Sequence, residues 1–100
     1  MEIYEVKGKE VEMGKIGDLA ERLGRSSQAI RKWEKRGIIP PTKFRDETNK
    51  RLYPAELIDK IAEIAKEENI QAGVSFDETN FEERAHQAFA EIEEEILEEE

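Results

Sequence analysis

The chain has 100 residues, the size of one compact domain. Hydrophobic residues make up 37% of it and charged residues 41%, so we expect a small core that is rich in helix. The sequence contains no cysteine and one histidine, His86, which excludes disulfides, thiolate metal sites, a cysteine nucleophile and a histidine cluster. It has no run of 18 apolar residues and no apolar leader, so we expect a cytoplasmic protein without a membrane partner, metal or cofactor.

The net charge of −9 is distributed unevenly along the chain. Residues 22–51 hold ten basic and three acidic residues, whereas residues 71–100 hold one Arg and 11 acidic residues. Local charge, rather than net charge, decides what a surface attracts. We therefore predict one domain over residues 1–70 that contains the basic block 22–51, and over 71–100 a linker followed by an acidic amphipathic helix.

The first predicted element is a β-hairpin over residues 2–13. Apolar residues alternate with polar ones on both sides of the turn Lys7-Gly8-Lys9, and glycine suits the positive φ of such turns.

Two helices are expected next. In residues 16–24 the apolar positions follow the spacing of one helical face, and Gly24 is a typical helix end. Ser26 or Ser27 can cap a second helix, which Gly37 ends. Two helices separated by about four residues around a glycine have the outline of a helix-turn-helix. The outward side chains of the second helix are Gln28, Arg31, Lys32, Lys35 and Arg36.

The remaining elements are a small hairpin and two helices. In residues 43–53 two basic, aromatic segments flank polar turn residues, which is typical of the wing of a winged helix. Pro54 suits the first turn of a helix that runs to about Glu68. After a break over residues 69–75, Asp77 or Thr79 can cap the last helix.

These motifs together resemble the MerR-type winged helix-turn-helix. That family typically shows I-G-E-L-A in its first helix, T-I-R-Y-Y-E in its second, a G-L-L/I-x-P exit and an R-x-Y wing strand. The resemblance covers residues 13–68, and it extends to small phage-encoded MerR-like proteins and to the winged domains of excisionases and small terminase subunits. Two departures are Lys32-Trp33 in place of an aromatic pair, and Pro54 in place of Ser or Thr. The matching stretches are Ile16-Gly17-Asp18-Leu19-Ala20, Ala29-Ile30-Arg31-Lys32-Trp33-Glu34, Gly37-Ile38-Ile39-Pro40-Pro41 and Arg51-Leu52-Tyr53.

The resemblance implies a mainly α fold with small β elements: a winged helix-turn-helix with an N-terminal β-hairpin and a C-terminal acidic helix. It implies sequence-specific binding of double-stranded DNA, as a phage or prophage transcriptional regulator in the cytoplasm or nucleoid of a bacterial host. We do not expect an enzyme, because the sequence offers no nucleophile–base set, metal set or cofactor loop.

Polar groups at the start of the second helix suit the reading of bases in the major groove, and the cations that follow suit phosphates. The alternatives are structural: Arg51 is equally a partner for Glu34, Trp33 fits the core, and Phe44 and Tyr53 fit packing within the wing. His86 is expected on the helix surface. The predicted DNA-binding residues are Ser26, Ser27, Gln28, Arg31, Lys32, Lys35, Arg36, Arg45, Lys50, Arg51 and Tyr53.

The last helix carries one apolar stripe, which fits the a and d positions of about two heptads. The stripe predicts either a dimer or partner interface, with a pseudo-palindromic DNA site, or a helix folded back onto its own domain. The acidic end is a candidate competitor for the basic block or a dock for a basic protein partner, and its carboxylates are expected to be solvated. The stripe consists of Phe81, Ala85, Phe89, Ile92 and Ile96.

Two rival functions remain from the sequence. One is an architectural DNA-binding protein of the excisionase or small-terminase kind, which would assemble along DNA and bend it. The other is a protein-interaction adaptor that acts through the acidic C-terminal helix and shows no salt-sensitive DNA affinity.

Overall fold

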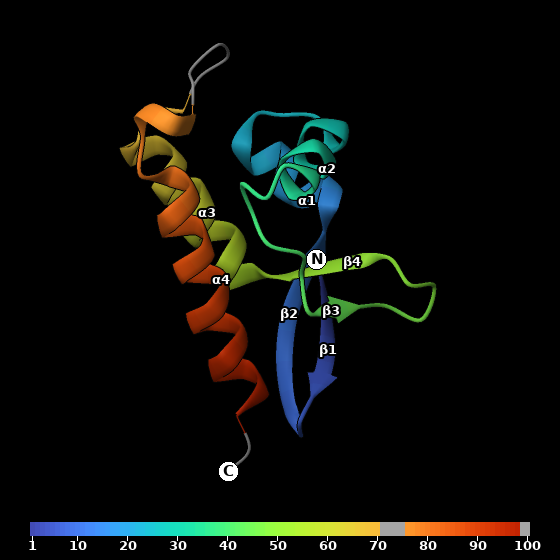
Figure 1. Cartoon of the computed structure of the whole chain (residues 1–100). Coiled ribbons are helices and arrows are strands. Elements are labelled where there is room, and N and C mark those ends of the chain that lie inside the picture. The colour runs from blue at the N-terminus through green and yellow to red at the C-terminus, as the bar shows by residue number, and fades with distance from the viewer. Residues whose placement is uncertain (71–75, 99–100) are drawn as a thin grey trace.

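The computed structural model describes residues 1–70 and 76–98. In this part of the chain, helices α3 and α4 lie side by side, and α1 and α2 lie beside one end of them (Figure 1). The β3–β4 hairpin projects to one side, whereas the β1–β2 hairpin runs alongside the C-terminal half of α4. The mainly α fold with small β elements is thereby confirmed. The elements are β1 Glu2–Val6, β2 Lys9–Lys15, α1 Ile16–Leu23, α2 Ser27–Lys35, β3 Phe44–Arg45, β4 Arg51–Pro54, α3 Ala55–Glu67, the short 3₁₀ helix η1 Phe76–Glu78 and α4 Phe81–Leu97.

Both hairpins belong to one antiparallel sheet with the strand order β1-β2-β4-β3. The N-terminal hairpin turns at Lys7 and Gly8, whose φ angles are +52° and +78°, as a two-residue turn requires. The end of β2 pairs with β4, so that Gly14 lies opposite Tyr53. The sheet therefore joins the N-terminal hairpin to the hairpin that follows α2.

Helices α1 and α2 form as their end signals predict. The backbone N–H of Lys15 donates to the carboxylate of Asp18 at 2.8 Å, which fixes the start of α1. Gly24 ends α1 in the left-handed region with φ +67°. The hydroxyl of Ser26 accepts the N–H of Ala29 at 3.1 Å and caps α2. Three residues thus separate the two helices.

The main core contains apolar residues from α1, α2, β4, α3 and α4. Helix α4 contributes Phe81, Ala85, Phe89 and Ile92, of which Phe81 and Ala85 are 0% exposed. The ring of Phe81 packs edge-on against Trp33 of α2, and that of Phe89 against Tyr53 of β4, with centroids 5.5 and 6.3 Å apart. The last helix is thus part of the same core as the first 70 residues.

This burial corrects the predicted dimer interface. Side chains that face the core of their own chain are not free to form a seam with a second chain. The fifth residue of the stripe, Ile96, is partly buried and packs against both apolar clusters of the chain. The alternative that the helix folds back onto its own domain describes the structure, because the short domain needs these side chains for its core.

A second, smaller cluster joins the sheet to the end of α4. Met13, Phe44 and Leu52 are buried there, and Leu97 packs against them. The ammonium of Lys9 donates to the carbonyls of Glu95 and Glu98, at 3.4 and 3.0 Å, where α4 ends and its carbonyls lack helical partners. The N-terminal hairpin is therefore held against α4.

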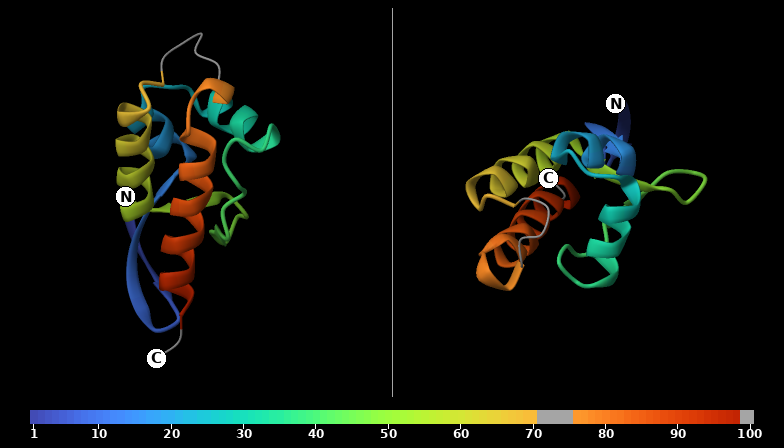
Figure 2. Two further views of the ribbon diagram at one scale, coloured as in Figure 1. Left: turned by 60° about the vertical axis from the view of Figure 1, so that its left-hand side comes forward. Right: turned by 90° about the horizontal axis from the view of Figure 1, so that it is seen from above.

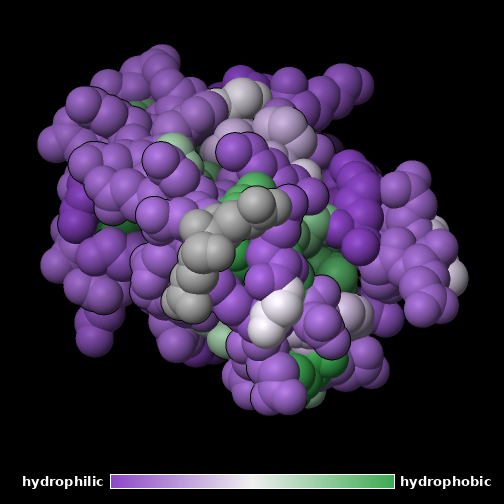
Figure 3. All heavy atoms as spheres, turned by 90° about the horizontal axis from the view of Figure 1, so that it is seen from below, coloured by the Kyte–Doolittle hydropathy of each residue, from purple (hydrophilic) through white to green (hydrophobic). Residues whose placement is uncertain are grey.

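Two views show how the charged elements are distributed. Helix α2 and the β3–β4 hairpin lie on one side of the molecule and α4 on another (Figure 2). Seen from below, the surface is mostly hydrophilic with small, separate apolar patches (Figure 3). Among the described residues, the large apolar side chains that are exposed are Met1 and Ile3. No helix in that part of the chain is long and apolar enough to cross a membrane.

We predict that Gly14→Ala destabilises the protein by about 1–3 kcal/mol. A Cβ atom at Gly14 would lie 2.9 Å from Cβ of Asp18 and 2.9 Å from Cδ1 of Ile58, and Asp18 is already held by its hydrogen bond to Lys15. Urea unfolding measures the loss. The control is Gly17→Ala in α1, where the added Cβ meets only Ser27 Oγ at 3.9 Å and helix propensity favours alanine. Equal stability of the two variants would contradict the crowding at Gly14.

We predict that Phe89→Ala costs about 3–5 kcal/mol of unfolding free energy, because it leaves a cavity in the core. The matched control is Gln87→Ala, an exposed position of the same helix, for which a change within about 0.5 kcal/mol is expected. Thermal melts measure the stability of each variant, and sedimentation measures its oligomeric state. A variant that kept its stability and lost a dimer would instead support a seam through α4.

Candidate DNA-binding surface

The outer face of α2 carries most of the predicted DNA-binding residues. Of the residues predicted there, Ser27 is partly buried and the others are exposed. Trp33 points inward and is 6% exposed, which agrees with its predicted place in the core. The N-terminus of the helix is capped by Ser26, so its remaining free N–H groups and its positive dipole end lie beside these side chains. The exposed residues are Ser26, Gln28, Arg31, Lys32, Lys35 and Arg36.

Two cations of this region lie against aromatic rings. The guanidinium of Arg25 lies 5.6 Å from the ring centre of Trp33 and also donates to the carbonyl of Ile70 at 3.3 Å. That of Arg36 lies 6.0 Å from the ring centre of Phe76. Arg36, predicted to bind the DNA backbone, thus also packs on η1, and such a contact adds stability of its own.

The β3–β4 hairpin forms in the stretch for which the sequence predicts a small hairpin. Its turn is organised by Asp46, whose carboxylate accepts the N–H groups of Thr48 and Lys50 at 2.8 and 2.9 Å. These hydrogen bonds, chiefly that from Lys50, hold the pKa of Asp46 below its ordinary value. The turn leaves the side chains of Arg45 and Lys50 exposed. Arg45 also donates to the carbonyl of Asn49 at 3.1 Å, within the same turn.

Arg51 is held by a partner on α2. Its Nε donates to Oε2 of Glu34 at 2.6 Å, and the two side chains are 29% and 15% exposed. The hydrogen bond to Glu34 raises the pKa of Arg51 above its ordinary value. Of the two predicted roles of Arg51, the geometry shows the structural one. The pair ties the hairpin strand β4 to α2, and each partner sets the position of the other.

Tyr53 is not on the surface, so its predicted contact with DNA is not available. The residue is 1% exposed and packs edge-on against Phe89. Its hydroxyl is buried without a hydrogen-bond partner in the described part of the chain, and burial raises its pKa to about 12. Both faces of β4 are buried, since Tyr53 points into the main core and Leu52 into the second cluster. The strand therefore has no outward face at Tyr53.

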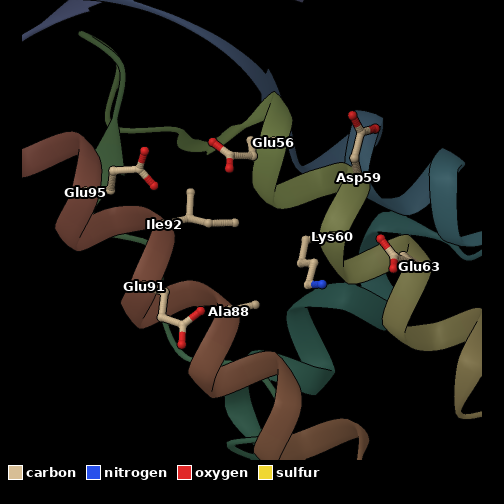
Figure 4. Close-up of a pocket in the computed structure, with 8 residues that line it drawn as sticks. All are labelled: Glu56, Asp59, Lys60, Glu63, Ala88, Glu91, Ile92 and Glu95. Atoms are coloured by element: carbon tan, nitrogen blue, oxygen red, sulfur yellow. The ribbon is translucent and has the colours of Figure 1, made fainter.

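Acidic side chains of α3 and α4 gather along the groove between these two helices. The groove has a volume of about 390 Å³, and Lys60 is its one cation (Figure 4). Such a surface repels DNA. Within residues 1–70 and 76–98, no three His, Asp or Glu side chains are placed to hold a metal. The lining residues are Glu56, Asp59, Lys60, Glu63, Ala88, Glu91, Ile92 and Glu95.

One carboxylate of the acidic end is not solvated. Glu93 is 2% exposed, and its Oε2 accepts the backbone N–H of Lys43 at 2.8 Å. Burial raises its pKa, although the hydrogen bond from Lys43 acts in the opposite direction. The prediction that the carboxylates of this segment are all solvated is therefore wrong at Glu93. The sequence does contain one signal of this burial: Glu93 follows Phe89 by four residues, which places it on the same, buried face of the helix.

The family comparison decides the identity of the helix-turn-helix. The model of the MerR helix-turn-helix family of regulatory proteins matches residues 15–78, more than half of the chain. The chain belongs to the MerR family. No curated protein and no solved structure gives a significant match. The matched stretch of this MerR-family protein includes α1, α2, both strands of the second hairpin and α3. The family assignment makes it a DNA-binding regulatory protein.

We predict that Tyr53→Phe leaves this MerR-family protein as stable as before or stabilises it by up to about 1–3 kcal/mol, the cost of a buried hydroxyl without a partner. Its DNA affinity should not change, because the ring lies in the core. Urea unfolding and DNA titration measure the two properties. Tyr4→Phe is the control, since the hydroxyl of Tyr4 donates to exposed Glu2 at 2.9 Å. A specific loss of DNA affinity in Tyr53→Phe would restore Tyr53 as a contact residue.

Proposed function

We propose that this MerR-family protein binds a specific sequence of double-stranded DNA and regulates transcription, with α2 in the major groove and the β3–β4 hairpin as a wing beside it. The observation that carries the proposal is the placement of cations. Helix α2 and the β3–β4 hairpin, which carry the exposed cations, lie on one side of the molecule, and α4 lies on another (Figure 2). Acidic side chains of α3 and α4 line the groove between those two helices (Figure 4).

Each group has a role in this proposal. Gln28 and Arg31, near the start of α2, suit base edges, because Gln pairs with adenine and Arg with guanine. Lys32 and Lys35 suit phosphates, and so do Arg45 and Lys50 of the hairpin. Ser26, Ser27 and Arg36 are secondary contacts, since the first caps the helix, the second is partly buried and the third packs on Phe76.

Phage or prophage origin belongs to the same proposal, and its support is the sequence resemblance. A symmetric pair through α4 does not belong to it, because the stripe that would form the seam is used in the core. The smallest DNA site that fits the proposal is therefore one half-site, about the length that a single recognition helix and its wing can cover.

The test is a fluorescence anisotropy titration of labelled random duplex at a series of salt concentrations, followed by selection of a site from a random library. We expect binding at about 50 mM salt that weakens steeply as salt rises. Lys50→Ala should reduce the salt slope by about one. Arg31→Ala should cost about 1–3 kcal/mol on the selected site and relax its sequence preference.

The matched control is Lys60→Ala, which removes the same charge from the acidic groove and should leave the affinity and the salt slope unchanged. An absence of salt-sensitive binding would contradict the proposal and favour the adaptor. Growth of complexes along the duplex with strong bending would favour the architectural protein.

A further inference from the structure

The two elements of the proposed DNA contact are joined by residues 36–43, which we term the connector. It leaves the end of α2, buries Ile38 and Ile39 in the core, and enters β3 at Phe44. Its path sets where the hairpin lies relative to α2. The relative position of these two elements decides whether both can reach one duplex at the same time.

Helix α4 contacts the connector near both of its ends. Nε2 of His86 lies 2.7 Å from the carbonyl oxygen of Gly37, just after α2. Seven residues further along α4, Glu93 accepts the N–H of Lys43, just before β3. Two residues spaced by seven lie on one face of a helix, about 10 Å apart along its axis. One rigid helix therefore contacts both ends of the connector.

Glu93 is the unusual member of this arrangement. Among the described residues, the buried polar or charged side chains are Thr42 and Glu93. Both lie at the end of the connector that enters β3. Thr42 donates to the carbonyl of Leu52 on β4 at 2.6 Å and accepts the N–H of Phe44 at 3.2 Å. Thr42 thus ties the connector to the hairpin and also interacts with the carboxylate of Glu93, which ties the connector to α4.

Burying a carboxylate costs free energy, and an apolar residue that fills the same space often gives equal or greater stability. General stability of the core therefore does not account for a carboxylate at this position. What an apolar residue would not supply is an acceptor for the N–H of Lys43, which lies outside the strand and its ladder.

We propose that Glu93 is a positioning residue, which holds the connector so that α2 and the β3–β4 hairpin keep the relative placement needed to bind one DNA duplex. The proposal rests on the proposed DNA-binding function. It gives one carboxylate of the acidic helix a role in DNA binding without contact to DNA. The aromatic contacts of Phe81 with Trp33 and of Phe89 with Tyr53 hold α4 against the same two elements.

The test compares Glu93→Leu with Glu93→Gln. Both variants remove one negative charge, but only Gln keeps an oxygen that can accept the N–H of Lys43. We expect Glu93→Leu to bind DNA roughly tenfold more weakly than Glu93→Gln, with a smaller salt slope, because the hairpin cations lose phosphate contacts. Hydroxyl-radical footprints should lose the flank under the hairpin and keep the major-groove contact. Glu94→Leu, at an exposed neighbouring position, should behave like the wild type.

A second pair of measurements needs no DNA, so that failure of the proposed function can be told from failure of this proposal. In Glu93→Leu, amide hydrogen exchange at Lys43 should be faster than in Glu93→Gln. Because the chain has no cysteine, spin labels can be placed through Lys35→Cys on α2 and Glu47→Cys on the hairpin. Their distance distribution should be narrow in the wild type and in Glu93→Gln, and broad in Glu93→Leu.

Equal distance distributions, or equal DNA affinity and salt slope, in folded Glu93→Leu and Glu93→Gln would overturn the proposal. If Glu93→Leu does not fold, Thr42→Val replaces it, since this variant keeps the shape of the side chain but removes both the hydrogen bond to Leu52 and the interaction with Glu93. For Thr42→Val we expect the same broad distance distribution and the same smaller salt slope of DNA binding. Wild-type values of both would overturn the proposal. A wild type that binds no DNA but shows the expected exchange and distances would reject the function alone.

Discussion

The burial of one face of α4 against the rest of the chain is the constraint on which the structure depends. With 37% hydrophobic residues, the chain has few side chains with which to exclude water. Its core uses apolar residues from every helix. Phe81 packs on the inner face of α2 and Phe89 on that of β4. The helix α4, which carries more acidic residues than any other helix, is thus the one on which the basic elements rest. Apart from buried Glu93, its acidic side chains face outward, because its other face packs in the core.

The same packing accounts for the departure at Lys32-Trp33. Where the resembling family has two adjacent aromatic residues, this chain has one, Trp33. The structure surrounds that ring with aromatic residues from elsewhere in the sequence, namely Phe76 and Phe81, at centroid distances of 5.2 and 5.5 Å. The remaining position, Lys32, is exposed on the outer face of α2. The motif position without an aromatic residue therefore adds a cation to the outer face of α2, while Trp33 finds its aromatic neighbours in a distant segment.

Local signals predicted the elements well. Gly24 and Ser26 mark the ends of α1 and α2, and Lys7-Gly8 marks the first hairpin, because each acts through its own backbone and its nearest neighbours. Contacts between residues that lie far apart in the sequence could not be predicted from such signals. The period of the α4 stripe shows that one face is apolar but does not say what covers it. Likewise, apart from its spacing from Phe89, nothing in the sequence distinguishes Glu93 from the neighbouring glutamates. Its burial depends on the hydrogen bond from Lys43, which lies 50 residues away in the sequence. For the candidate site, the exposed cations of α2 were predictable, whereas the burial of Tyr53 and the partner of Arg51 required the fold.

The separation of charge has a consequence for how the molecule approaches a polyanion. Because α4 is fixed in the core, the acidic and basic sides keep a constant orientation and give the protein a permanent electric dipole. The electric field of a duplex exerts a torque on this dipole, which turns the basic side of the protein toward the DNA before contact. The effect acts within about one Debye length, roughly 10 Å at 0.1 M salt. An acidic helix that repels DNA thereby increases the share of encounters that begin in the right orientation, even though it lowers the overall attraction.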